Sequence, residues 1–400
     1  MPQISLIKKL LIWVALFGAG LFLYAFIIGA PMLFVIILVL VIFFNRTIKP
    51  GAISIKNSSI YTWVNKNRQY IQNVTLAAGT VTLCLIIFEL WLRTDRSLKS
   101  YTEQTGSGGY QSPYDNDTKG WLHLYKPHQV WEDNTPEFIH HVRANALGLN
   151  DREYQVHKDS AVRIITLGDS FTEGVGSTGD SSYPKILQTI LPGSEVMGCG
   201  ISGSDPLFEY KLLQQKLLPY RPDIVTVAIN YSDIIDVIGR GGFERFGPDG
   251  TFQSKKGPAW EPLFANYYIV RLLALKLFHT DFLLLTNKKR IVEDKKAIAI
   301  LKSSIDSIQT LCNYNHIRCI FILHPMLPEI NGDKRIPCYP VLEYARQKGC
   351  ETIDMASVFY AQGITPRNAC NYYWKLDGHN NNAGYAIFAK AIKDKIQHNL

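Results

Sequence analysis

Arg163-Ile-Ile-Thr-Leu-Gly-Asp-Ser-Phe-Thr-Glu-Gly174 joins a short apolar run to a glycine and then to a polar turn. The pattern predicts a strand that ends at Gly168, followed by a tight turn that exposes Asp169 and Ser170. In open α/β sheets, ligands bind in the crevice outside the carboxyl ends of the strands. A serine in this turn is therefore expected to present its hydroxyl to a ligand.

From residue 162 onward, apolar runs of strand length alternate with segments of helical periodicity. The expected strands are 162–167, 195–199, 223–230, 318–324 and 351–355. The expected helices are 182–191, 206–218, 293–313, 340–348 and 383–396. This alternation predicts an α/β fold with a parallel sheet covered by helices on both faces. An insertion at about 239–287, with an apolar helix near 267–285, interrupts the rhythm and lies after the carboxyl end of a strand.

The first part of the chain is strongly apolar, and residues 10–44 contain no charged side chain. As one helix this segment would be about 52 Å long, whereas the hydrocarbon core of a bilayer is about 30 Å thick. Gly29-Ala30-Pro31 lies near its middle, where a helix would break. We therefore predict transmembrane helices at about 10–28, 31–45 and 74–92.

Basic residues indicate the topology of these helices. Lys8 and Lys9 precede the first helix, and the 45–73 connection carries several basic residues and no acidic one. Both segments are expected on the cytoplasmic side by the positive-inside rule. Three spans then place the rest of the chain in the periplasm or outside the cell, as an inner-membrane protein of a bacterium. A single tilted span within 10–44 would reverse this orientation.

These features divide the chain into a membrane region at 1–93, a polar stem with irregular strands at 94–143, and an α/β domain at 144–400. The net charge of +8 forms no basic stripe of the kind that binds nucleic acid. Six of the seven cysteines lie in the C-terminal domain, an even number that is compatible with disulfides of unassigned pairing. The sequence contains no Cys-x-x-Cys pair, and we interpret His140-His141 as a surface pair, so no metal or organic cofactor is expected.

Polar residues with complementary chemistry follow the predicted strands in order. Ser170 follows the first strand, Gly200 follows the second, and Asn230 ends the third. Asp377-Gly378-His379 comes just before the last helix. A serine nucleophile needs a base that a carboxylate orients, together with donors for the developing oxyanion. Taken singly, each of these residues is also a common helix cap or turn residue.

Together these blocks resemble the four-block pattern of the SGNH/GDSL hydrolase family from about residue 144 to the C-terminus. The resemblance implies a flavodoxin-like three-layer α/β/α sandwich with a parallel sheet, preceded here by the transmembrane helices. It implies that Ser170 is the nucleophile, His379 the base and Asp377 its orienting acid. It also implies an oxyanion hole made by the backbone N–H of Ser170, Gly200 and Asn230.

The sequence departs from the family pattern at three places. Gly198 stands where the second block often has Asn, and Ala228 stands where the third block often has Gly. Asp377 precedes His379 by two positions, whereas the family usually has three. This closer spacing is similar to that of the alginate-type O-acetylation enzymes of the same superfamily. It leaves open whether the acyl group goes to water or to a sugar hydroxyl.

The sequence thus predicts a membrane-anchored serine ester hydrolase or O-acyltransferase. O-acetylated cell-surface polysaccharide or envelope glycan is the expected substrate, and proteins of polysaccharide synthesis are the expected partners. One alternative is a non-catalytic protein that binds glycan or scaffolds an envelope assembly. Another is a lipid-directed esterase or thioesterase, which the apolar helix near 267–285 would suit.

Overall fold

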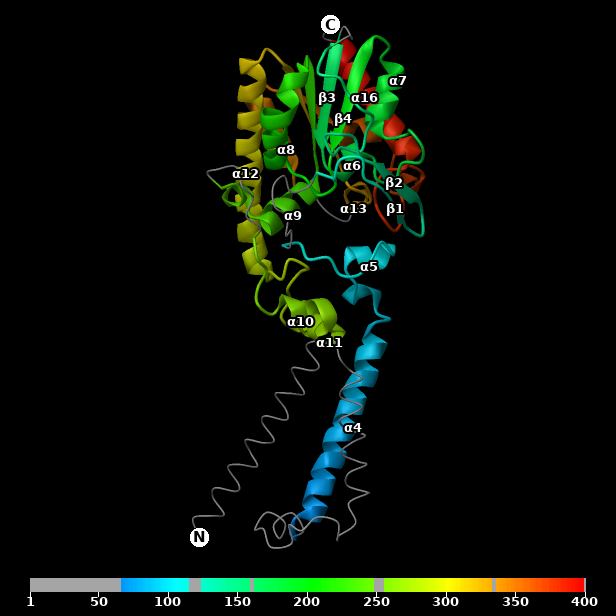
Figure 1. Cartoon of the computed structure of the whole chain (residues 1–400), viewed down its shortest axis with the longest axis vertical. Coiled ribbons are helices and arrows are strands. Elements are labelled where there is room, and N and C mark those ends of the chain that lie inside the picture. The colour runs from blue at the N-terminus through cyan, green and yellow to red at the C-terminus, as the bar shows by residue number, and fades with distance from the viewer. Residues whose placement is uncertain (1–65, 115–123, 159–161, 248–254, 333–335, 399–400) are drawn as a thin grey trace. The chain divides into compact units, whose positions relative to one another are not determined.

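The computed structural model describes residues 66–114, 124–158, 162–247, 255–332 and 336–398 (Figure 1). The chain divides into two compact units. Of the described residues, the smaller contains those from 66 to Leu98 together with Trp260–Leu277, and the larger contains those within Lys99–Ala259 and from Phe278 to residue 398. The transmembrane helices predicted at 10–28 and 31–45 lie outside the described residues.

A five-stranded parallel sheet forms the centre of the larger unit. Its strands lie in the order β4 (Ser194–Gly200), β3 (Val162–Gly168), β5 (Ile224–Ile229), β6 (Arg318–Leu323) and β7 (Glu351–Asp354). Counted along the chain, this is the order 2-1-3-4-5 of flavodoxin-like sheets. The interior strands β5 and β6 are mostly apolar and buried along nearly their whole length, as expected where helices cover both faces. The predicted fold class is confirmed.

Helices cover both faces of this sheet (Figure 1). Residues of β5 alternate between the two resulting cores, with Val225 and Val227 on one side and Ile224 and Ala228 on the other. The first core includes residues of α8 (Pro206–Leu212) with its continuation η2 (Leu213–Leu217), α9 (Tyr231–Arg240), α12 (Asn287–Tyr314) and α14 (Tyr339–Gln347). The second includes residues of α7 (Tyr183–Ile190), α15 (Met355–Ala361) and α16 (Asn382–Gln397).

The helices α9 and α15 are not among those predicted. Asn230 caps α9 by accepting from the Ser232 backbone N–H. Asp354 caps α15 in the same way. Both helices are short, so their apolar periodicity extends over too few residues to stand out from the flanking loops.

The remaining elements are short. They are η1 (Arg96–Leu98), α5 (Tyr101–Thr105), α6 (Ser170–Glu173), η3 (Leu218–Tyr220), η4 (Gly242–Arg245), α13 (Leu327–Ile330) and η6 (Ala369–Asn371). An antiparallel hairpin of β1 (Val130–Asn134) and β2 (Ile139–Arg143) precedes the sheet. This hairpin and α5 belong to the same compact unit as the sheet. The boundary predicted at 143/144 therefore does not separate two units, because the expected stem packs as part of the α/β unit.

The smaller unit is built around α4 (Arg68–Leu92), which covers the span predicted at 74–92. Among the described residues, it is the one helix long and apolar enough to cross a membrane. Its single acid, Glu89, accepts hydrogen bonds from the backbone N–H groups of Tyr268 and Ile269, each at 2.9 Å. Glu89 thus satisfies the first N–H groups of a short helix within the insertion.

That part of the insertion contains α10 (Glu261–Asn266), α11 (Tyr268–Leu272) and η5 (Leu273–Leu277). The buried guanidinium of Arg271 donates to the carbonyls of Phe264 at 2.8 Å and Leu98 at 3.1 Å. The apolar helix predicted near 267–285 ends at Leu277, before the positive φ angles of His279 and Leu284.

Candidate active site

The turn after β3 leaves Ser170 half-buried, whereas Asp169, which was predicted to be exposed with it, is buried. Gly168 has φ of +152°, and a Cβ atom at this position would lie 2.0 Å from Thr172 Oγ1. A glycine is therefore needed where the strand turns into α6. Asp169 caps α6 by accepting from the Phe171 backbone N–H, and Ser170 is the first residue of the helix.

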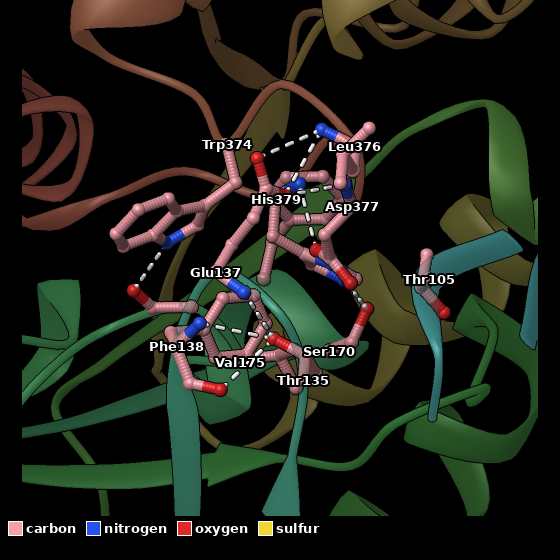
Figure 2. A network of polar contacts seen from close by, with 12 residues as sticks. Thr105, Thr135, Glu137, Phe138, Ser170, Val175, Trp374, Leu376, Asp377 and His379 are labelled. Atoms are coloured by element: carbon pink, nitrogen blue, oxygen red, sulfur yellow. Dashed lines mark hydrogen bonds and ion pairs between the residues drawn. The ribbon is translucent and has the colours of Figure 1, made fainter. Parts of the chain in front are cut away.

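The loop before α16 brings His379 and Asp377 to the serine. His379 Nε2 lies 2.7 Å from Ser170 Oγ, and His379 Nδ1 lies 2.5 Å from Asp377 Oδ1 (Figure 2). An ionised carboxylate can only accept, so Nδ1 carries the hydrogen and Nε2 is left to accept from the serine hydroxyl. The Ser170 hydroxyl can therefore pass its proton to His379 Nε2, while Asp377 holds the other ring nitrogen of His379.

The charges within this group of side chains favour that protonation pattern. Burial opposes a charged imidazole, but the nearby Asp377 carboxylate outweighs it, so the pKa of His379 is raised above its usual value. Burial also opposes ionisation of Asp377. The charge and hydrogen bond of His379, together with a hydrogen bond from Tyr101, outweigh burial and lower the pKa of Asp377. The pair can accept the serine proton and hold the resulting imidazolium beside a carboxylate.

Asn230 lies behind the serine turn at the end of β5. Its side chain is buried, and its Nδ2 donates to Asp169 Oδ2 at 2.9 Å. The Ser232 hydroxyl also donates to Asp169 Oδ2, at 2.7 Å. Asp169 thus ties the turn that carries Ser170 to the predicted oxyanion residue, a role that the sequence pattern does not reveal. The site lies between the ends of β3 and β5, where the chain order of the sheet reverses.

Gly200 ends the edge strand β4, opposite Gly168 of β3. A Cβ atom on Gly200 would lie 2.1 Å from the Glu173 backbone nitrogen and 2.4 Å from the Thr172 carbonyl carbon. This strand end therefore packs directly on the backbone of α6, the helix that begins at Ser170. Packing alone requires glycine at position 200, whether or not its N–H serves an oxyanion.

The interpretation of His140-His141 as a surface pair is correct for His141 and wrong for His140. His140 is buried, and its Nε2 lies 3.0 Å from Glu173 Oε1. Glu173 also accepts from the Tyr125 hydroxyl at 2.8 Å, and from the backbone N–H and hydroxyl of Ser202 at 2.7 Å each. This cluster joins the β1–β2 hairpin, the serine helix and the loop after Gly200.

Glu137, in the turn of the same hairpin, holds the loop that carries Asp377 and His379. It accepts from the backbone N–H of Leu376 at 2.9 Å and from that of Asp377 at 2.8 Å (Figure 2). Beside it, Phe138 packs against Trp374 with ring centroids 5.5 Å apart. No local sequence signal marks Glu137 as part of the site, because its partners lie more than 200 residues away in the chain.

His324 follows β6 and packs beneath the site. The Phe171 ring lies between His324 and His379, with centroids 4.4 Å and 4.6 Å from theirs. His324 Nε2 lies 2.7 Å from Asn380 Oδ1. Burial lowers the pKa of His324 to about 3, so it supports the site as a neutral, packed ring.

The described residues also bear on the requirements of a metal site and of disulfides. Among them, no group of three or more His, Cys, Asp or Glu side chains is placed to hold a metal ion. All seven cysteines lie in described segments and carry free thiols.

Comparison with known proteins gives likeness at the level of overall structure. No protein-family model and no curated protein matches the sequence. Among solved structures, a two-domain esterase active on acetylated mannans is similar at 14% identity and a TM-score of 0.37. That match covers 59% of this chain and 49% of the esterase, about half of its length.

Two further similar structures are a lipolytic protein of the G-D-S-L family from Desulfitobacterium hafniense and an acetylxylan esterase from Geobacillus stearothermophilus. Both are 15% identical to this chain. The first has a TM-score of 0.36 and covers 58% of this chain and 99% of its own. The second has a TM-score of 0.37 and covers 59% and 94%. Likeness at this level does not by itself establish a family or an activity.

Proposed function

We propose that this chain is a membrane-anchored serine esterase or O-acyltransferase that acts through Ser170, His379 and Asp377. The observation that carries the proposal is the continuous contact from Ser170 Oγ to His379 Nε2 and from His379 Nδ1 to Asp377 Oδ1. A scaffold or glycan-binding protein would not need a hydroxyl, an imidazole and a carboxylate in this order. The arrangement therefore supports catalysis over a purely structural role.

The proposed reaction has two half-reactions. Ser170 Oγ attacks the acyl carbonyl carbon while His379 Nε2 takes the hydroxyl proton, and the charge on the acyl oxygen is met by backbone and side-chain donors. We assign these donors to the backbone N–H groups of Ser170 and Gly200 and the Asn230 amide. The tetrahedral species collapses, the C–O bond to the alcohol breaks, and His379 returns the proton to the leaving alkoxide.

The acyl-serine is then released by a second nucleophile. Water or a sugar hydroxyl attacks the acyl carbon, His379 takes its proton, and Ser170 leaves with that proton restored. Water yields a free carboxylic acid, whereas a sugar hydroxyl yields a new ester. We propose O-acylated envelope glycan as the substrate class, on the basis of the Asp-x-His spacing and the preceding membrane helix.

Replacement of the nucleophile tests the mechanism. Ser170→Ala in the full-length protein is expected to abolish turnover of p-nitrophenyl acetate and labelling by a fluorophosphonate probe, because only an activated serine reacts with the probe. Ser177→Ala is the matched control, since the Ser177 hydroxyl donates to the Gly174 carbonyl at 2.7 Å and leaves the proton path untouched. Equal turnover and labelling in Ser170→Ala would refute the proposed mechanism.

Substrate and location require separate measurements. Mass spectrometry of surface glycan from cells with and without the protein is expected to differ in O-acetyl content. A preference for long-chain over acetyl esters would favour a lipid substrate instead. External protease added to spheroplasts is expected to cleave the α/β unit, which would place this unit outside the cytoplasm.

A further inference from the structure

A tyrosine from outside the α/β core contacts the acid of the proposed triad. Tyr101 is the first residue of α5, in the segment that follows α4 in the chain. Its hydroxyl lies 2.6 Å from Asp377 Oδ2, 3.0 Å from the Asp377 carbonyl oxygen and 3.5 Å from His379 Nδ1. A carboxylate and a carbonyl only accept, so the phenol donates its hydrogen to Asp377.

We propose that Tyr101 is a positioning residue of the site, whose O–H holds the outer oxygen of the Asp377 carboxylate and thereby sets the basicity of the Asp377–His379 pair. This inference rests on the proposed function, because it assigns a role within the same triad. It adds a fourth side chain to the hydrogen-bonded series Ser170, His379 and Asp377. It also makes a residue of the segment between membrane helix and sheet part of the catalytic apparatus.

The two oxygens of Asp377 have different partners. Oδ1 faces His379, with the ring Nδ1 at 2.5 Å and the backbone N–H at 3.1 Å. Oδ2 faces Tyr101, and the Asp377 backbone N–H is held by Glu137. The Asp377 side chain is only 6% exposed, so solvent has little access to replace a lost donor. Loss of the Tyr101 hydroxyl would remove a donor from Oδ2 while the contacts of Oδ1 and the backbone remain.

The short helix α5 fixes Tyr101 in place although its side chain is half exposed. Glu103 accepts from the Ser100 backbone N–H at 2.8 Å and from the Ser100 hydroxyl at 2.7 Å, which closes the first turn. Thr105 Oγ1 donates to the Tyr101 carbonyl at 3.1 Å. Gly106 ends the helix in a left-handed conformation. These contacts hold the Tyr101 backbone, so its hydroxyl is presented in a defined direction.

The charges around the pair determine the sign of the effect. The charged or titratable groups near Asp377, His379 and Tyr101 from the adjacent elements are Asp133, Glu137, Asp169, Glu173, His324 and Tyr385. Among these, the Asp169 and Glu173 carboxylates favour a protonated His379. Tyr101 has the opposite effect on the pKa of His379. Its hydrogen bond stabilises the charge of the Asp377 carboxylate, so the carboxylate gains less from a neighbouring imidazolium. Burial and the adjacent Asp377 charge raise the pKa of Tyr101 far above its usual value, so it stays a donor.

Replacement of one oxygen atom tests the proposal. Tyr101→Phe in full-length protein should leave Asp377 more basic, and His379 should therefore hold its proton to higher pH. The acidic limb of kcat/KM for p-nitrophenyl acetate is expected to move up by about one pH unit, the scale of a hydrogen bond to a charged group. Well below the midpoint of that limb, kcat/KM should fall about tenfold. The pH dependence of fluorophosphonate labelling should shift in the same direction, since it reports serine activation without substrate binding.

The control is Tyr114→Phe, which removes the hydroxyl of another tyrosine in the same segment. That hydroxyl donates to the Leu283 carbonyl and does not contact the proposed triad. Tyr114→Phe should leave both acidic limbs in place, even if it lowers the melting temperature. An acidic limb in Tyr101→Phe that stays at the wild-type pH, in protein that melts like the wild type, would overturn the proposal. Failure of the proposed function would look different, because then the wild type itself would not be labelled at Ser170.

Discussion

The buried Glu173 cluster offers a sharp test of how the hairpin supports the site. The Glu173 side chain has no exposed surface and pairs with His140, which is 6% exposed. On the same hairpin, Glu132 pairs with His141 at 2.9 Å, but both side chains are 54% exposed. The chain thus contains a buried and an exposed Glu–His pair on adjacent residues of one strand, β2. We compare Glu173→Gln with Glu132→Gln.

The expected magnitude follows from the hydrogen bonds of Glu173. One oxygen accepts from Tyr125 and His140, and the other accepts twice from Ser202. A glutamine can keep its oxygen on Ser202 and turn its NH₂ toward Tyr125 and His140, which can both rearrange to accept. The substitution then removes the negative charge from four bonds. Hydrogen bonds to charged groups contribute about 1.5–3 kcal/mol against about 0.5–1.5 kcal/mol for neutral ones, which is a difference of about 4–6 kcal/mol over four bonds. Glutamine also removes the cost of burying a charge, which offsets part of this difference, so we expect a net loss of about 2–3 kcal/mol.

Thermal unfolding of full-length protein in detergent measures this loss. For a unit of this size the expected decrease in Tm is about 4–10 °C for Glu173→Gln. Glu132→Gln should change the free energy of unfolding by less than about 0.5 kcal/mol, because exposed pairs contribute little. Equal Tm values for the two variants would refute the argument that the Glu173 cluster holds the hairpin and the loop after Gly200 together.

The pH dependence of the free energy of unfolding gives a second test of Glu173→Gln. Burial opposes ionisation of Glu173, but the hydrogen bonds from His140, Ser202 and Tyr125 outweigh it and lower its pKa in the folded state. A carboxyl with a lowered pKa stabilises the fold above its unfolded pKa of about 4.3, and that stability is lost as pH falls through the folded value. The advantage of wild type over Glu173→Gln should therefore shrink below about pH 4. A difference that stays constant to pH 3 would contradict this assignment.

Two further predictions concern the proposed triad and its packing. The pKa of His379 is raised by Asp377, and His379 must be neutral to act, so kcat/KM on p-nitrophenyl acetate should rise through a limb centred above about 6.5. Asp377→Asn should move that limb down and lower kcat by orders of magnitude, and a limb that does not move would argue against the pairing. Gly200→Ala should destabilise the protein by about 1–3 kcal/mol in chemical denaturation, since its Cβ would meet the backbone of α6. Gly109→Ala, where an added Cβ meets no atom within 4 Å, is the matched control, and equal stability of both variants would contradict the packing argument.

Local patterns were sufficient to predict the sheet and the positions of the proposed triad. Parallel strands that are buried on both faces must be apolar throughout, so their runs stand out, and their carboxyl ends must meet at one edge. Residues that follow the runs at 162–167 and 223–230 therefore lie close together, whatever the conformation of the connecting loops. The contact of His379 with Ser170 follows from the same rule, because the loop before α16 returns to that edge.

The supporting residues could not be predicted because their partners are distant in the chain and their own surroundings are unremarkable. Tyr101 lies in a segment of small polar residues that is typical of a linker, and only its contact with Asp377 distinguishes it. His140 and His141 are identical neighbours in sequence, yet the alternation of a strand buries the first and exposes the second. The register of the hairpin decides this difference, and two adjacent histidines do not reveal which of them faces inward.

The difference between local composition and distant contacts also explains why a boundary at 143/144 was expected and does not separate two units in the structure. Composition identifies segments that lack an apolar core of their own, and residues 94–143 fit that description. Such a segment can still pack if it brings polar groups to buried partners on another element. Here Tyr101, Glu137 and His140 contact three different parts of the α/β unit, namely Asp377, the Leu376–Asp377 backbone and Glu173. The proposed triad is therefore assembled by the α/β core but held by the segment that precedes it, and substitutions in this segment should change activity before they unfold the sheet.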